Sequence, residues 1–345
     1  MKYLTRFLFL VIFSFTNHLT AQSLGEHYNN LVNEAELSIT EGNYKQALNK
    51  YKEAYTTGVG FGVDLYNAAV CAHKEKNTEQ VLAFADKLAG KGVGAKFFKR
   101  KVFESYISDK AFQKVIHKAE KVRKEKMQAN SKYLAGLNEF GKRDSIYNKL
   151  RLTKYHDEWK LPDTLENLFR DNTRNMLDYI KKNGFYSEKK LGVHIASDTM
   201  FGEIRRPDIV FLHYLEMGRD KNLLDEIKDI YINKMISGDI KPSFLAGIIE
   251  LSNQVFVETG GYIFNIFECQ IYKLREVPEF DEINRRRKTY LQLSLDDFEK
   301  KLVFKYCRNS YFDFHYTLIN RPVSKEDYFY SNSDVIGNVK DCKLN

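Results

Sequence analysis

The spacing of apolar positions predicts helices along most of the chain. In the first third, small and aromatic residues recur at intervals of 34 residues. The three sets that share this spacing are Ala35, Gly42, Tyr44, Ala47, Tyr51 and Ala54; Ala69, Lys76, Thr78, Val81, Ala85 and Leu88; and Phe103, Lys110, Phe112, Val115, Ala119 and Val122. Such a period predicts helical hairpins that pack side by side, with small residues where two helices approach closely.

This pattern resembles the tetratricopeptide repeat, with units at residues 28–61, 62–95 and 96–129. The first unit matches best, because Gly42 suits the turn between two helices. The second lacks that glycine and the second aromatic residue, and the third has phenylalanine where small residues are usual. The resemblance implies a right-handed stack whose concave groove binds a peptide or partner segment, without catalysis. A generic bundle of amphipathic helices is the alternative for the second and third units.

The helix start and stop signals continue after the repeats. Residues 133–152 predict a helix that caps the stack or joins it to the next region. The further helices begin or end at the turn residues Pro162, Gly184, Pro207, Gly218, Gly238, Pro242, Pro278 and Ser294. The stretch from Tyr262 to Tyr272 mixes aromatic and β-branched residues, which leaves strand, loop and helix all open.

The second region resembles an uncharacterised family of exported bacterial domains over about residues 163–306. The matching pieces are Leu165–Arg174, Asn183-Gly184-Phe185 followed by Gly192, His213, Gly238 with Pro242, and Asn284-Arg285-Arg286-Arg287 before Leu295. The family brings no established activity with it. This chain departs from its pattern at Tyr262-Ile263-Phe264, and the chain after Arg308 has no counterpart.

The first 21 residues have the pattern of a secretory signal peptide. Lys2 and Arg6 precede the apolar run Phe7–Phe13, and Ala21 supplies a small residue at the expected cleavage site. The apolar run is about half of the ~20 residues that a membrane-spanning helix needs. We therefore expect a soluble periplasmic or secreted protein without a transmembrane segment. It is not expected to be a lipoprotein, because no cysteine follows the cleavage site.

Composition and charge narrow the class of protein. Hydrophobic residues make up 43% of the chain and charged residues 29%, which is ordinary for folded domains, and 345 residues suggest two of them. The net charge of +8 is mild, and no nucleic acid is expected as a partner of an exported protein. The basic stretch Lys96–Lys132 is interpreted as a solvated helix face, with attraction to anionic polymers or lipid headgroups as the alternative.

The four cysteines, at positions 71, 269, 307 and 342, lack the spacing of a zinc site or a thioredoxin-like pair. We therefore expect no metal and no cofactor. Cys269 and Cys307 are one candidate disulfide pair in an oxidising compartment, although the sequence does not set the connectivity. Cys71 is expected to behave as a small buried hydrophobic residue.

Catalysis has only scattered candidates, since no phosphate loop, nucleophile elbow or paired-histidine motif is present. His213, together with Asp171, Arg174 and Asp178 on one helix face, would form a polar cluster able to move a proton or grip an anion. Charges at this spacing usually line a solvated face, and a histidine in an apolar helix is more often a core residue bonded to a carbonyl or hydroxyl. Arg285–Arg287 diverge around a helix and are expected to be solvated.

Taken together, the sequence predicts an all-α protein. The expected parts are a signal peptide (1–21), tetratricopeptide-like repeats (22–132), a capping or linker helix (133–158), a helical domain (159–307) and a C-terminal tail (308–345). The expected function is that of an exported scaffold protein that binds a protein or peptide partner through the repeat groove. The alternatives are an envelope hydrolase using His213, Asp171 and Arg174, and a structural protein of the envelope.

Overall fold

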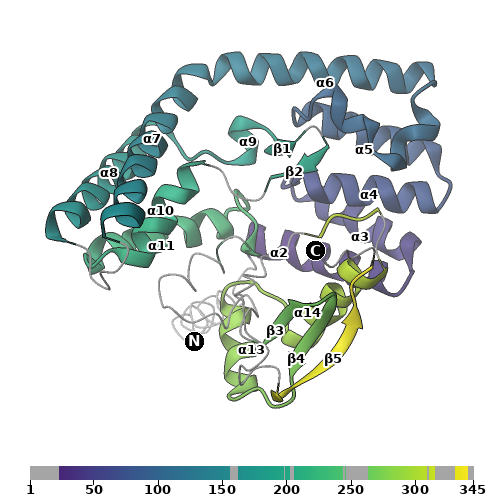
Figure 1. Cartoon of the computed structure of the whole chain (residues 1–345). Helices are drawn as coiled ribbons and strands as arrows, with labels where there is room; N and C mark the ends of the chain where they lie inside the picture. Colours follow the sequence, from purple (N-terminus) through teal and green to yellow (C-terminus); the bar gives the residue numbers. More distant parts are fainter. Residues whose placement is uncertain are drawn as a thin grey trace, which may run out of the picture.

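The structure, a computed structural model, describes residues 23–155, 162–197, 199–202, 206–243, 245, 263–308, 311–314 and 331–340. The described residues form an all-α fold of stacked helices with a few short strands, as the sequence predicts. Figure 1 shows three groups: a helical stack up to residue 129, a second helical group up to residue 236, and a unit near the C-terminus that contains a small sheet.

The first group is a stack of helical hairpins. Its first hairpin joins α2 (Leu24–Thr40) to α3 (Tyr44–Thr56), and its second joins α4 (Gly62–Lys74) to α5 (Thr78–Gly90). Helices α3 and α5 begin at residues 44 and 78, which reproduces the 34-residue period of the sequence. The third hairpin pairs two short 3₁₀ helices, η2 (Ala95–Lys99) and η3 (Lys101–Tyr106), with the long helix α6 (Lys110–Ala129).

Most positions with this spacing lie inside the stack. The fully buried ones are Ala35, Ala47, Tyr51, Ala54, Ala69, Val81, Ala85, Leu88, Phe103, Phe112 and Ala119. Gly42 has a φ of +81°, and Lys76 enters the same left-handed region with a φ of +55° at the next turn. Tyr44 differs, because its ring is half-buried and packs on Phe312 instead of between two helices.

The third hairpin departs from the regular pattern. Its first arm is not an α-helix, because the chain breaks at Arg100, whose ψ of 141° is extended. Four bulky side chains on either side of this break are buried: Phe97, Phe98, Val102 and Phe103. The 3₁₀ arm of the third hairpin therefore buries bulky side chains, whereas the first two hairpins use regular α-helices.

The second group contains α7 (Ser131–Lys154), α8 (Asp163–Asn183), α10 (Arg206–Met217) and α11 (Lys221–Ile236). Helix α7 follows α6 directly and packs against α8 and α10, so it links the stack to this group. Between the two groups lie the short helix α9 (Glu188–Leu191) and a hairpin of β1 (Ile195–Ser197) and β2 (Met200–Phe201).

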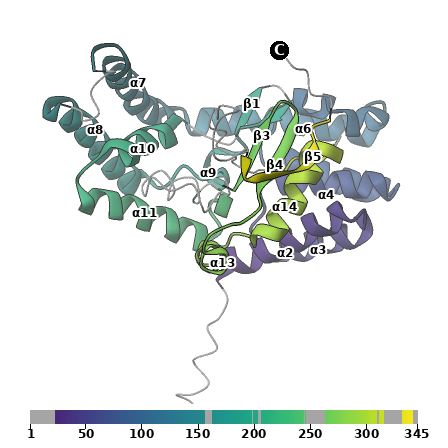
Figure 2. The same ribbon diagram turned by 60° about the horizontal axis from the view of Figure 1, so that its bottom comes forward.

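The third unit is an antiparallel sheet in the order β3-β4-β5, flanked by two helices (Figure 2). Its elements are β3 (Phe264–Phe267), β4 (Gln270–Leu274), α13 (Phe280–Thr289), α14 (Leu295–Val303), the π-helical turn η4 (Phe304–Arg308) and β5 (Ser333–Asn338). Gln270 of β4 pairs with Asn338 of β5. The stretch expected to be a tail therefore supplies the edge strand of this sheet.

Buried ion pairs join the later units to the stack. The Lys301 Nζ on α14 lies 2.6 Å from the Glu36 carboxylate on α2, and the Lys241 Nζ lies 2.6 Å from the Asp64 carboxylate on α4. Burial lowers the pKa of Lys301. Burial also opposes the charge on Lys241, but the charges of Asp64 and Glu36 outweigh it and raise the pKa of Lys241. Loss of one partner would leave the other charge buried and unpaired, which is costly. The two ion pairs therefore hold the later units against the stack.

The cysteines differ from one expectation. Cys269 is disulfide-bonded while Cys307 is free, so the candidate pairing of these two residues is wrong; the partner of Cys269 lies outside the described residues. Cys71 is free and buried, as expected, and burial raises the pKa of its thiol. Over the described part of the chain, no helix has both the length and the apolar character needed to cross a membrane.

Candidate functional site

His213, the first catalytic candidate, has an acidic partner. Its Nδ1 on α10 lies 2.8 Å from Oδ2 of Asp144 on α7, and its ring faces Phe169 edge-on. The sequence favoured a carbonyl or hydroxyl partner, but the carboxylate comes from a residue 69 positions earlier. A buried aspartate can orient an imidazole for catalysis. In this molecule the contact joins two packed helices, and the side chain of His213 is only 21% exposed.

The charged residues on α8 do not contact His213. Arg174 pairs with Glu226 at 3.0 Å and with Asp220 at 3.4 Å, both from the segment around α11. Asp171 is exposed and lies near Arg170 of its own helix. The structure therefore gives His213, Arg174 and Asp171 three different sets of partners and does not assemble them into one cluster. Among the described residues, no three His, Cys, Asp or Glu side chains are placed to hold a metal ion.

The structure instead brings a remote part of the chain onto the helical stack. Residues Tyr311–Phe314, here called the docked segment, lie against α4 and cross it as the yellow trace in Figure 1. The Asn67 side chain donates from Nδ2 to the Asp313 carbonyl at 2.9 Å and accepts from the Asp313 N–H at 2.9 Å. The Tyr66 hydroxyl donates to the Tyr311 carbonyl at 2.7 Å. These three bonds reach only backbone atoms of the docked segment.

Other residues contact the side chains of the docked segment. Both terminal nitrogens of Arg100 lie 3.2 Å from Oδ2 of Asp313. The ring of Phe312 stacks on Tyr44, with centroids 5.8 Å apart, and the Lys74 Nζ lies 4.5 Å from the centre of the Tyr311 ring. We call the five residues that make these contacts the segment site: Tyr44, Tyr66, Asn67, Lys74 and Arg100.

The local fold explains how the segment site is assembled. Asn67 and Lys74 lie seven residues apart on α4 and therefore share one helix face. Arg100 stands at the extended break between η2 and η3, where its guanidinium carbon lies 3.8 Å from the centre of the Tyr66 ring. Burial raises the pKa of Tyr66 to about 12, although the charge of Arg100 opposes this shift. Tyr66 thus keeps its proton at neutral pH and can donate to a backbone carbonyl.

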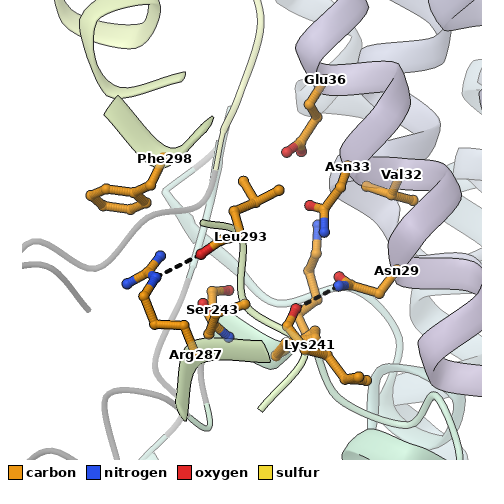
Figure 3. A pocket seen from close by; sticks show the side chains of 12 residues that line it. Asn29, Val32, Asn33, Glu36, Lys241, Ser243, Arg287, Leu293 and Phe298 are labelled. Carbon is orange, nitrogen blue, oxygen red and sulfur yellow. Dashed lines mark hydrogen bonds between the residues drawn. The ribbon is translucent and has the colours of Figure 1, made fainter. Parts of the chain in front are cut away.

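A second polar feature is a small cavity beside α2 and the end of α13 (Figure 3). Arg287 donates from Nε to the Leu293 carbonyl, and Asn29 donates from Nδ2 to the Leu291 carbonyl. Arg287 is 1% exposed, which corrects the expectation that all three consecutive arginines are solvated. The walls of the cavity come from α2, from residues 241–243 and from residues 287–298, so the cavity lies where the stack meets the third unit.

Comparisons of the chain with protein-family models, with curated proteins and with solved structures find no significant match. The candidate site therefore stands on its own contacts.

Two features of the sequence pointed to the segment site, although the repeat spacing does not reveal them. Asn67 and Asp64 are polar residues inside the apolar helix α4, and both are fully buried, so each requires a partner. The docked segment itself is an acidic residue among three aromatic ones in a stretch that looked like a tail. The sequence does not show that these two features meet, because 246 positions separate Asn67 from Asp313.

Proposed function

We propose that this protein is an exported binding protein whose tetratricopeptide-like stack holds a short extended segment of a protein partner. The observation that carries the proposal is the double hydrogen bond of Asn67 to one backbone residue, with Arg100 on the acidic side chain of that same residue. This arrangement combines recognition of any extended backbone with selection of one side chain. Peptide-binding surfaces that add a strand to a domain divide affinity and specificity in the same way.

Two further observations support the proposal. Tyr44, Tyr66 and Arg100 all contact the docked segment, and aromatic and arginine side chains are the residues that dominate binding interfaces. The cleavable-signal pattern of residues 1–21 and the disulfide at Cys269 agree with export to an oxidising compartment. The signal sequence itself lies outside the described residues.

Selection from a library of displayed peptides tests this function. The bait is the mature full-length chain with Asp313→Ala, so that the chain's own carboxylate does not occupy Arg100. We expect enrichment of peptides in which an acidic residue neighbours aromatic residues. Adding Arg100→Ala should abolish the enrichment, because the acid then has no cationic partner.

Lys118→Ala is the matched control, because it also removes a cation but from an exposed pair with Asp86 on α5. Its selected peptides should be the same as those of the bait. The proposed function fails if no peptides are enriched, or if Arg100→Ala and Lys118→Ala retain the same set.

A further inference from the structure

The segment site is filled by the chain itself, through contacts between residues as distant in sequence as Arg100 and Asp313. We propose that the docked segment is a tethered competitor. A partner that binds the site carries the same chemistry, an acidic residue among aromatic ones, and displaces Tyr311–Phe314. This inference rests on the proposed function, since it describes how that same site is regulated.

The contacts define what the partner's segment must contain. The bonds from Asn67 and Tyr66 reach only backbone atoms, so they do not depend on which side chains the partner's segment carries. Arg100 requires a carboxylate two residues after the position that faces Lys74, and Tyr44 requires a flat ring between those two positions. The partner is therefore a protein with an accessible aromatic–aromatic–acidic stretch.

Exchange of one segment for another costs little free energy, because the incoming stretch replaces the backbone, aromatic and acidic contacts of Tyr311–Asp313 with equivalent ones. The Arg100–Asp313 pair lies at the solvent edge, with side chains 18% and 28% exposed. Releasing Asp313 exposes a carboxylate to water while the incoming carboxylate leaves it, so the net desolvation is small. Phe314 is 1% exposed and packs on Phe304 of η4 in the core of the stack, so the incoming segment must also carry a ring after its acidic residue.

The tether favours the chain's own segment. A linked ligand competes at an effective concentration in the millimolar range, far above that of most free partners. If the docked state holds about 90% of molecules, apparent affinity for a free peptide falls about ten-fold, and a larger docked fraction weakens it further. Weakening the docked segment should therefore strengthen partner binding, which is the opposite of what loss of an ordinary structural contact would do.

The test is a binding titration with a fluorescent peptide that copies residues 309–316, Asn-Ser-Tyr-Phe-Asp-Phe-His-Tyr. It is titrated into the unaltered mature chain, into Asp313→Ala and into Asp313→Arg, which places a second cation against Arg100. Asp334→Ala is the matched control, because it removes an aspartate from an exposed pair with Arg275 on the sheet. Circular dichroism melts identify which variants are folded, and either Asp313 variant alone carries the test.

We expect the peptide to bind the Asp313 variants at least about ten-fold more tightly than it binds the unaltered chain or Asp334→Ala. Adding Arg100→Ala should remove this gain. Equal affinity for the unaltered chain and the Asp313 variants would overturn the competitor mechanism, while leaving the proposed function in place if Arg100→Ala still weakens binding. Absence of binding to every folded variant would overturn both.

Discussion

At the residue scale, buried polar side chains on helices mark the contacts that organise the molecule. Asn67, Asp64 and Asp144 are all buried, and each has a partner on another element. That such residues need partners can be predicted from the sequence alone, because an unsatisfied buried polar group is costly. The partners themselves could not be predicted, because the chain must first fold to bring distant residues together.

The contact between His213 and Asp144 gives a testable prediction at this scale. His213→Ala should reduce the free energy of unfolding by ~1 to 3 kcal/mol, because it leaves a buried carboxylate without its hydrogen-bond partner. Denaturant titration of the mature chain measures this change.

The double variant His213→Ala/Asp144→Ala serves as the control. Its loss of unfolding free energy should be smaller than the sum of the losses in the two single variants, because no buried group is left without a partner when both are removed. Strictly additive costs would show that the two side chains do not depend on one another.

At the element scale, helix boundaries follow local signals, whereas the edge strand β5 does not. Helix α8 begins at Asp163 and ends before Gly184, whose φ is +86°, where the sequence predicts both ends. The stretch containing β3 and β4 stayed open between strand, loop and helix. Strands β3 and β4 pair with each other across the turn at Glu268 and Cys269, whereas the pairing of β4 with β5 joins distant residues such as Gln270 and Asn338, and no local pattern records it.

Close packing between elements gives a second prediction, at Gly25 in the first turn of α2. A methyl group there would overlap the Met235 carbonyl oxygen at the end of α11. Gly25→Ala should therefore lower the melting temperature of the mature chain, even though alanine favours a helix. Gly90→Ala is the control, because Gly90 ends α5 with open space around it, and it should leave stability unchanged or raise it. A similar gain at both positions would mean that α2 and α11 do not pack as described.

At the scale of the whole molecule, the third unit depends on residues that looked separate in the sequence. The repeat period predicts the first two hairpins well, because it records contacts between neighbours in the chain. It carries no information on the last part of the chain, which supplies both β5 and the docked segment. The expected cluster added His213 to the helical face of Asp171 and Arg174, and tertiary packing gives these residues different partners. The candidate site could therefore be predicted only in part, from the polar Asn67 inside an apolar helix and from the aromatic residues around Asp313.

Hydrogen exchange across residues 311–314 reports most directly on whether the docked segment gives way to a partner. The unaltered mature chain is labelled in deuterated buffer, with and without a saturating amount of the 309–316 peptide, and the exchange of each fragment is read by mass spectrometry. We predict faster exchange at residues 311–314 when the peptide is bound, because the Asp313 N–H loses its bond to Asn67, while α4 stays protected. Saturation by the peptide with unchanged or slower exchange at residues 311–314 would contradict displacement and place the peptide at another site.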